Sequence, residues 1–542
     1  MLSSITPITL LTLAAALQGL AQNFIPVTGV PVNQQAVPYR RNINELQAEG
    51  GAQWSLYNLA LLAMQQDSDE YLLSYFQISG IHGLPFIEWN GAGPGVGGNW
   101  GGYCPHNENL FLPWHRAYIL LFEQTLVDRA RQIASSYPQQ VRAQWLYAAE
   151  TLRSPYWDWA SDPGVPPATL APTVRVMGNQ LFEIEIQNPL APYRFPQAVL
   201  NGKYGPFDQQ MRAWTYRCPA PNSYPQSANG LLASRPLRQW TYDILTRAGT
   251  FTEFSLSGGL VSVEQIHNQI HLDAACGNIF SEFALTAFDP LFMLHHTQVD
   301  RLWSYWQVLR PDQDIFTQPY AGLARFSTRQ GTIINWNSPL EPFFDRRRAF
   351  LTTSAVRAIW NFGYSYLGIE WWQKNEAQMR QDVTRIVNQL YGFNNNRPPG
   401  WVQKRAEPVT RYFARMKVDV AQLQRPCRVV LYVNGTRAGN LAVMNRPEKG
   451  VMQTGFGLDV VASAEELRSI LEAEQESFKP TVEVEIRKLD GNILPLKSVT
   501  SLEVEMEAVK VLHPPTVDEL PRYGKPRRFE ANVVDKHGHV KS

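Results

Sequence analysis

The sequence predicts a mainly α-helical domain built around a four-helix bundle at residues 22–392, followed by a smaller β-sandwich domain at residues 409–515. Apolar residues recur with the helical period in three segments: 112–135, 262–272 and 290–309. Later segments instead alternate or cluster β-forming residues: 411–419, 427–433, 481–488 and 500–510. A polar stretch with Pro, Gly and Asn at 393–408 divides the two patterns and is predicted to be a linker.

Composition narrows the class of protein. The chain has 542 residues, of which 44% are hydrophobic, so it can bury a large core in more than one domain. Lys and Arg number 49 and Asp and Glu 48, which gives a net charge of +1. This balance argues against a nucleic-acid partner, which a basic excess would favour. The last segment, residues 516–542, is predicted to be a polar tail.

The N-terminus is predicted to be a signal peptide at residues 1–21. Residues 5–18 are almost wholly apolar, and Gly19-Leu20-Ala21 offers a cleavage site before Gln22. The apolar run is shorter than the roughly 20 residues that a membrane span needs. We therefore expect a secreted, extracellular protein without a membrane anchor.

Seven of the ten histidines fall into two clusters, at 82–115 and 267–296. They are His82, His106, His115, His267, His271, His295 and His296. The other three lie in the C-terminal part: His513, His537 and His539. A single histidine in an apolar setting is usually structural, but two compact clusters indicate metal ligands.

The spacing of the clustered histidines suits chelation. His267 and His271 are four residues apart on a predicted helix, so both rings project from one face and can bind one ion. His296 is in register with the apolar stripe of its helix and is predicted to point inward, in preference to its neighbour His295. His115 is likewise in phase with apolar residues of its helix. Each cluster thus offers three imidazoles, which a helical bundle can hold.

The ligand set narrows the choice of metal. Imidazole suits zinc, copper, iron and nickel. The segment 267–271 reads HNQIH and lacks the glutamate after the first histidine that HExxH zinc proteases use as general base, so a zinc hydrolase is a distant alternative. Two neighbouring three-histidine sites, with no carboxylate or thiolate recruited, fit a pair of copper ions.

Two longer motifs resemble the copper signatures of the tyrosinase family. Residues 106–123, HNENLFLPWHRAYILLFE, resemble the first signature, and residues 289–300, DPLFMLHHTQVD, resemble the second. The segments IPVTGVPV, YFQISGIHG and PYWDWA are similar to secreted fungal members. The resemblance implies a type 3 copper enzyme (a polyphenol oxidase) that uses molecular oxygen. Such enzymes hydroxylate monophenols at the ortho position and oxidise o-diphenols to o-quinones, as in melanin formation.

The resemblance also implies roles for individual residues. It assigns two copper ions to two ligand sets: His82, His106 and His115 for copper A, and His267, His271 and His296 for copper B. Glu264 and Asn268 are expected to hold a water that deprotonates the phenol. Phe292 is expected to pack beside the copper B imidazoles. Cys104 is expected to form a thioether with His106.

Beyond the copper site, the resemblance implies a latent precursor. Tyr364-Ser365-Tyr366 resembles the motif that ends the catalytic core, and the β-rich domain resembles a region that covers the active site. An aromatic side chain of that domain, Tyr432 or Phe456, is expected to enter the substrate pocket. Lys404-Arg405 in the linker is a candidate site for a kexin-type protease, whose cut would activate the zymogen.

The sequence also allows other functions and other roles for individual residues. A catechol oxidase or an o-aminophenol oxidase would have the same fold and copper but little monophenol hydroxylation, and a hemocyanin-like oxygen carrier would share the copper site. Asp300 is predicted either to orient a copper ligand or to form a salt bridge with a nearby arginine. Arg116 and Glu123 are predicted to be structural partners. A disulfide between Cys218 and Cys276 is one of several pairings that four cysteines allow.

Overall fold

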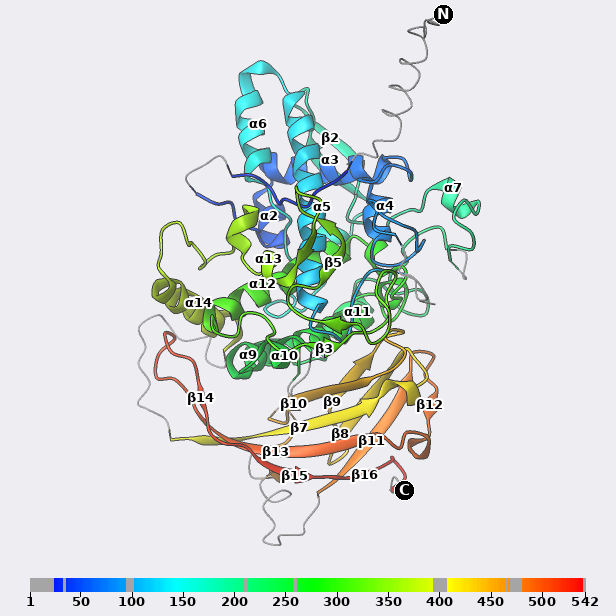
Figure 1. The fold of residues 1–542 in the computed structure, drawn as a ribbon, viewed down its shortest axis with the longest axis vertical. Helices are drawn as coiled ribbons and strands as arrows, with labels where there is room; N and C mark the ends of the chain where they lie inside the picture. Colours follow the sequence, from blue (N-terminus) through cyan, green and yellow to red (C-terminus); the bar gives the residue numbers. More distant parts are fainter. Residues whose placement is uncertain are drawn as a thin grey trace, which may run out of the picture.

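The helix-rich and β-rich parts of the chain occupy opposite ends of the molecule (Figure 1). The computed structural model describes residues 24–539 except 33–35, 94–101, 209–211, 257–260, 393–406, 460, 464–465 and 468–479. The predicted signal peptide and the Lys404-Arg405 pair lie outside the described residues. Helices α2 to α14 precede residue 392, and the strands of the C-terminal region, from β7 onward, all follow it.

The helix-rich part contains helices α2 to α14. They are α2 (Ile43–Glu49), α3 (Gly51–Gln66), α4 (Tyr75–Gly80), α5 (Phe111–Ser135), α6 (Gln139–Thr151), α7 (Gln197–Leu200), α8 (Gln226–Ala233), α9 (Leu237–Arg247), α10 (Phe251–Ser255), α11 (Val263–Asp273), α12 (Leu291–Leu309), α13 (Thr353–Val356) and α14 (Glu376–Tyr391). Short strands between them form two-stranded sheets: β1 (Thr173–Met177) with β2 (Glu183–Gln187), β3 (Tyr320–Ala321) with β4 (Ile333–Ile334), and β5 (Pro339–Phe344) with β6 (Phe350–Thr352).

The three helices predicted from apolar periodicity are confirmed. Helices α5, α11 and α12 begin and end within one residue of the predicted segments. Helix α11 begins where the Ser262 hydroxyl accepts a hydrogen bond from the Gln265 backbone amide, which satisfies one of the free N–H groups of the first turn. Every residue of α11 is buried, so this helix is enclosed by other parts of the chain on all sides.

The C-terminal region is β-rich, as predicted, and its strands form two five-stranded sheets. The strands are β7 (Val409–Asp419), β8 (Cys427–Val433), β9 (Thr436–Val443), β10 (Val451–Gly457), β11 (Thr481–Lys488), β12 (Ile493–Leu494), β13 (Glu503–Leu512), β14 (Arg522–Tyr523), β15 (Arg527–Glu530) and β16 (Asn532–Val534). One sheet has the order β10-β7-β13-β14, with β15 also paired to β13, and the other has the order β12-β11-β8-β9, with β16 paired to β11. Strands β14 to β16 come from the segment predicted as a polar tail, so the sheets extend beyond residue 515.

One disulfide, Cys218–Cys276, joins the segment before α8 to the turn after α11. Cys276 lies three residues after the last residue of α11, so the bond anchors the end of that helix. Cys104 and Cys427 are free and buried. A structural disulfide of this kind is typical of proteins that fold in an oxidising compartment.

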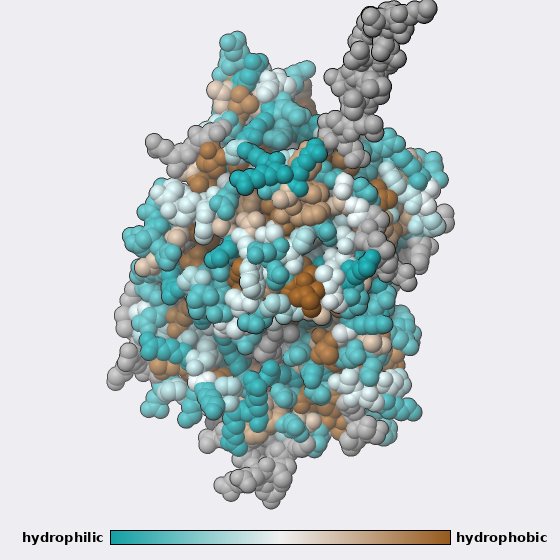
Figure 2. All heavy atoms as spheres, viewed as in Figure 1, coloured by the Kyte–Doolittle hydropathy of each residue, from teal (hydrophilic) through white to brown (hydrophobic). Residues whose placement is uncertain are grey.

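None of the described helices is long and apolar enough to cross a membrane. On the face drawn in Figure 2, apolar residues lie in small separate patches between polar ones. Scattered apolar residues of this kind are normal for a folded domain.

Candidate metal centre

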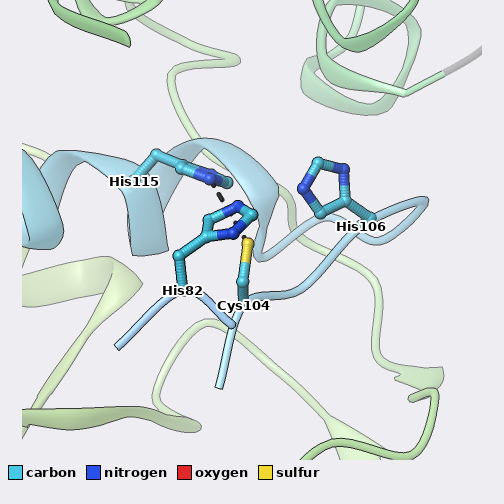
Figure 3. Close-up of side chains that lie close together, drawn as sticks. All are labelled: His82, Cys104, His106 and His115. Atoms are coloured by element: carbon cyan, nitrogen blue, oxygen red, sulfur yellow. Dashed lines mark hydrogen bonds between the residues drawn. The ribbon is translucent and has the colours of Figure 1, made fainter. Parts of the chain in front are cut away.

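The histidines of the first cluster converge around Cys104 (Figure 3). His82 lies two residues after α4, His106 lies in the segment that precedes α5, and His115 lies in α5 itself. One ligand atom from each of these four residues lies within 4.8 Å of the other three, and all four side chains are buried. The structure thus brings together the three histidines that the sequence groups here.

The second cluster lies on two helices that contact each other. Helix α11 contributes His267 and His271, and α12 contributes His295 and His296. The Nε2 atom of His267 is 2.9 Å from Nε2 of His271 and 3.1 Å from Nε2 of His296. The ring of His296 also stacks on that of His115, with ring centroids 4.3 Å apart. The two groups therefore adjoin.

Hydrogen bonds donated by Nδ1 fix the orientation of most of these rings. Three Nδ1 groups donate to backbone carbonyls: His82 to Phe283 at 3.1 Å, His115 to Phe111 at 2.8 Å and His271 to Phe280 at 2.8 Å. Two side-chain oxygens hold the next pair: Nδ1 of His106 donates to Glu264 at 3.0 Å, and Nδ1 of His267 donates to Asn268 at 3.0 Å. Because Nδ1 carries the proton in each ring, Nε2 presents a lone pair, which is the usual arrangement of histidine metal ligands.

The unpaired nitrogens indicate that the centre is built for a cation. With Nδ1 protonated on His267 and His271, two Nε2 lone pairs face each other across 2.9 Å and repel unless a cation is shared between them. Nε2 of His106 is buried and has no hydrogen-bond partner among the described residues. Buried polar atoms are almost always paired. Two groups of imidazole nitrogens, one of them with a thiol, suit copper and contain no carboxylate that a harder ion would prefer.

Burial keeps these imidazoles neutral. It lowers the pKa of His271 to about 3. Burial, reinforced by the neighbouring imidazoles, also lowers the pKa of five further members well below the usual histidine range: His82, His115, His267, His295 and His296. A histidine must be deprotonated to bind a metal ion. At neutral pH these side chains are therefore in the form that binds.

Cys104 lies among the first group as a thiol. Burial raises the pKa of Cys104 well above its usual value. Its Sγ atom lies 3.3 Å from Nε2 of His115 (Figure 3), while His106 turns its Nδ1 toward Glu264. The contact of the sulfur is thus with a different ring from the one predicted for the thioether, which stays a prediction.

Phenylalanine rings pack against the imidazoles. Phe292 stacks on His296 with ring centroids 4.0 Å apart, which is the position expected from the sequence. Phe283 lies 4.8 Å from the ring of His82 and 5.0 Å from that of His106, and sequence reasoning missed it. Phe283 lies in the segment between α11 and α12. Its backbone carbonyl accepts the hydrogen bond from His82, and its ring packs against residues far away in the sequence. Neither feature leaves a local pattern in the sequence.

A cavity of about 260 Å³ lies against the first group. Its walls include Cys104, His106 and Phe283 from the helix-rich part and residues 446–449 from the loop between β9 and β10. Beside this loop, Nδ2 of Asn107 donates to the carbonyl of Val451 at 3.2 Å. The C-terminal region therefore closes one side of the cavity.

Neither of the two aromatic residues considered for the substrate pocket lines this cavity. Tyr432 on β8 lies near Lys536, whose Nζ is 5.3 Å from the ring centroid. Phe456 on β10 packs directly over Gly439 of β9. The C-terminal residues at the cavity are instead those of the loop at 446–449.

Asp300 forms buried salt bridges with two arginines. Four side chains donate to its carboxylate: Arg40, Arg116, Tyr364 and Tyr366. Arg40 also pairs with Glu123 at 2.7 Å, and both side chains are fully buried. Of the two roles predicted for Asp300, the structure shows the salt bridge. It also confirms Arg116 and Glu123 as structural partners.

Comparisons with known proteins agree with this geometry. Residues 72–309 match the family described as "Common central domain of tyrosinase". The chain is 34% identical over 401 residues to a tyrosinase of Podospora anserina, covering 68% of this chain and 69% of that protein. It is 35% identical over 408 residues to a tyrosinase of Neurospora crassa, covering 68% of this chain and 58% of that protein. The fold is similar to that of a recombinant mushroom tyrosinase, with a TM-score of 0.77 and 23% identity over 94% of this chain and 100% of that one.

Proposed function

The chain belongs to the tyrosinase family of type 3 copper proteins, and from this premise we propose that it is a phenol oxidase that uses molecular oxygen. In this proposal it hydroxylates monophenols at the ortho position and oxidises o-diphenols to o-quinones. The observation that carries the proposal is the pair of adjoining groups of buried, neutral imidazoles. When bound, the copper ions supply the activation of oxygen and the oxidation of the phenol. The side chains orient the substrate, exclude water and hold protons.

The proposed ligand sets follow the geometry of the two groups. Copper A would be held by His82, His106 and His115, and copper B by His267, His271 and His296. His296 is preferred to His295 because its Nε2 lies 3.1 Å from Nε2 of His267. His295 instead accepts a hydrogen bond on Nδ1 from the indole of Trp159 at 3.0 Å. Helices α3, α5, α12 and α11, each of which contacts the next in this order, are proposed as the four-helix bundle around the centre.

We also propose the thioether between Cys104 and His106. The Cys104 sulfur lies within 4.8 Å of a ring nitrogen of His106, so a small rotation would bring the sulfur to the ring. Forming the C–S bond removes one hydrogen from the thiol and one from the ring carbon, and the oxygen that the enzyme uses would take up both. The bond would fix the His106 ring, and it would lower the mass of the cross-linked peptides by two hydrogen atoms.

Glu264 and Asn268 lie one turn apart on α11 and flank His267. Glu264 accepts a hydrogen bond from Nδ1 of His106 at 3.0 Å and from the backbone amide of Asn107 at 2.7 Å. Asn268 accepts from Nδ1 of His267 at 3.0 Å. We propose that the same two side chains hold a water that takes the phenol proton, a role that suits a buried carboxylate beside the reacting group.

Replacing Glu264 by glutamine is expected to lower tyrosine oxidation roughly a hundredfold, since the variant loses a general base. L-DOPA oxidation should fall much less, and both coppers should stay bound, because the amide oxygen can still accept the hydrogen bond from His106. Oxygen uptake with each substrate measures the two rates. The matched control is Glu253→Gln, at a half-buried position in the first turn of α10. An equal fall with both substrates would mean that Glu264 acts only by holding His106.

We further propose that the chain is secreted as a latent precursor. The Cys218–Cys276 disulfide supports folding in an oxidising compartment, and the loop at 446–449 supports a covering role for the C-terminal region. In this proposal the two sheets form a β-sandwich after a linker at 393–408, and a kexin-type protease cuts at Lys404-Arg405. The quinones produced would enter melanin-type pigment.

Cleavage of the linker is expected to raise the rate of L-DOPA oxidation, because it allows the loop at 446–449 to leave the cavity. The measurement is oxygen uptake before and after treatment with a kexin-type protease, with the cut position determined by mass spectrometry. A chain carrying Lys404→Ala and Arg405→Ala should resist the protease and stay latent. An unchanged rate after a confirmed cut would remove the precursor proposal.

Oxygen uptake with tyrosine and, separately, with L-DOPA tests the proposed activity. The copper-loaded chain is assayed before and after cleavage. Uptake with both substrates is the expected result. Uptake with L-DOPA alone would indicate a catechol oxidase, and reversible oxygen binding without turnover would indicate a hemocyanin-like carrier.

A further inference from the structure

Helix α11 has two faces with different partners. His267 and His271 are four residues apart and share the face that meets the other histidines. Gln269 and Asp273 are also four residues apart, and each lies two residues beyond one of these histidines, on the opposite face. Their side chains are 1% and 0% exposed, so this outer face is as enclosed as the inner one.

The C-terminal region supplies the partners of the outer face. Nδ2 of Asn440, on β9, donates to Oε1 of Gln269 at 2.6 Å in a buried hydrogen bond. Arg428, on β8, pairs with Asp273 at 3.0 Å. Between these two polar contacts, Leu272 packs against Ala442 and Met444 of the same region.

These contacts are linked to one another. Gln269 donates through Nε2 to Asp273, so the two outer-face residues share one network. Arg235 of the helix-rich part pairs with Asp273 from the other side, at 2.6 Å. Asn440 is itself oriented by Arg437, which donates to its Oδ1 at 2.6 Å. Losing one partner from a buried network of this kind is costly, because it leaves a buried polar group unpaired.

We propose that Asn440 and Arg428 are positioning residues for copper B, acting through Gln269 and Asp273 to set the position of α11. The C-terminal region would then be part of the framework that binds copper B, in addition to covering the cavity. The inference rests on the proposed copper ligands. Its physical basis is that metal affinity depends on how firmly the groups behind the ligands hold them.

A competition for Cu(I) measures this effect without relying on activity. The full-length apo chain is loaded with Cu(I) under anaerobic conditions and titrated with the chromophoric chelator bicinchoninate. In Asn440→Leu and Arg428→Met we expect one of the two coppers to be lost at roughly tenfold lower chelator concentration, as for other residues that support a ligand. Adding His115→Ala leaves only site B, which should show the whole effect, whereas adding His271→Ala leaves only site A, which should show none.

The matched control is Arg411→Met. Arg411 also links the two parts of the chain, pairing with Asp243 at 2.6 Å, but Asp243 lies on α9, which carries no histidine of the centre. This variant should hold both coppers like the unmodified chain. Equal weakening in Arg411→Met would mean that docking in general, and not the contact with α11, supports the site, and would overturn the inference.

A double-mutant cycle gives the second test, and it uses no charged residue. If Asn440 acts through Gln269, Asn440→Leu should add no further loss of copper affinity to Gln269→Met. A full additional loss would contradict the inference, as would unmodified affinity in Asn440→Leu and Arg428→Met. Failure of the unmodified chain to bind two coppers would instead refute the proposed function itself.

Discussion

Replacing His267 by alanine is expected to remove copper B and abolish phenol oxidation. His267 lies at the centre of its group, with Nε2 atoms of two other histidines within 3.1 Å, so its loss leaves the proposed copper B set with two imidazoles. Loss of a catalytic metal removes several kcal/mol of transition-state stabilisation, so we expect a fall in the L-DOPA oxidation rate of at least roughly 10³-fold. Copper content should fall from two ions per chain to one.

Three further histidine variants serve as controls for this prediction. His537→Ala changes an exposed residue and should leave both coppers and the rate unchanged. His295→Asn keeps an acceptor for the Trp159 indole and should also retain two coppers, whereas His296→Asn should lose one. The reverse pattern, with His295 essential and His296 dispensable, would show that the ligand on α12 is misassigned.

Asp300→Asn is expected to destabilise the fold by roughly 3–5 kcal/mol, the usual cost of leaving buried charges uncompensated. In the native protein the Asp300 carboxylate forms ion pairs with both Arg40 and Arg116, and all three side chains are at most 2% exposed. Urea unfolding followed by tryptophan fluorescence measures the free energy of unfolding. Glu503→Gln is the matched control, because its ion pair with Lys417 is exposed and should contribute less than about 1 kcal/mol.

The difference in the free energy of unfolding between the unmodified chain and Asp300→Asn should change with pH in a definite direction. Burial acts to raise the pKa of Asp300, but Arg116 and Arg40 outweigh it, so the pKa lies below the usual aspartate value. A carboxylate with a lowered native pKa contributes stability above its unfolded pKa, about 3.9, and loses that contribution as the pH falls through the native value. The gap between the unmodified chain and Asp300→Asn should therefore narrow in acid. A gap that stays constant or widens below pH 4 would contradict the salt-bridge role.

Features with a local period or a fixed spacing could be predicted from the sequence. The apolar stripes give α5, α11 and α12 to within one residue, because burial of one helix face imposes that period. The spacing of His267 and His271 predicts two imidazoles on one helix face because it reflects one helical turn, and their Nε2 atoms lie 2.9 Å apart. The apolar stripe of α12 also predicts that His296, and not His295, points inward. In the structure the ring of His296 stacks on that of Phe292.

Features set by contacts between distant segments could not be predicted in this way. The carbonyls of Phe280 and Phe283 hold two of the imidazoles, and a backbone oxygen leaves no trace in residue type. The pairing of Cys218 with Cys276 depends on the route of the chain across 58 residues. The contact of Asn440 with Gln269 joins residues 171 positions apart. Only the folded chain shows that the two faces of α11 serve different partners.

The metal content of the purified full-length chain tests the central claim most directly. Elemental analysis by mass spectrometry, after the chain has been offered copper and zinc together and excess ions have been removed, gives both ions per chain. We predict two copper ions per chain and no stoichiometric zinc, because two adjoining groups of neutral imidazoles are present. One zinc ion per chain with no copper would contradict the assignment of a copper-dependent phenol oxidase and would favour a zinc hydrolase instead.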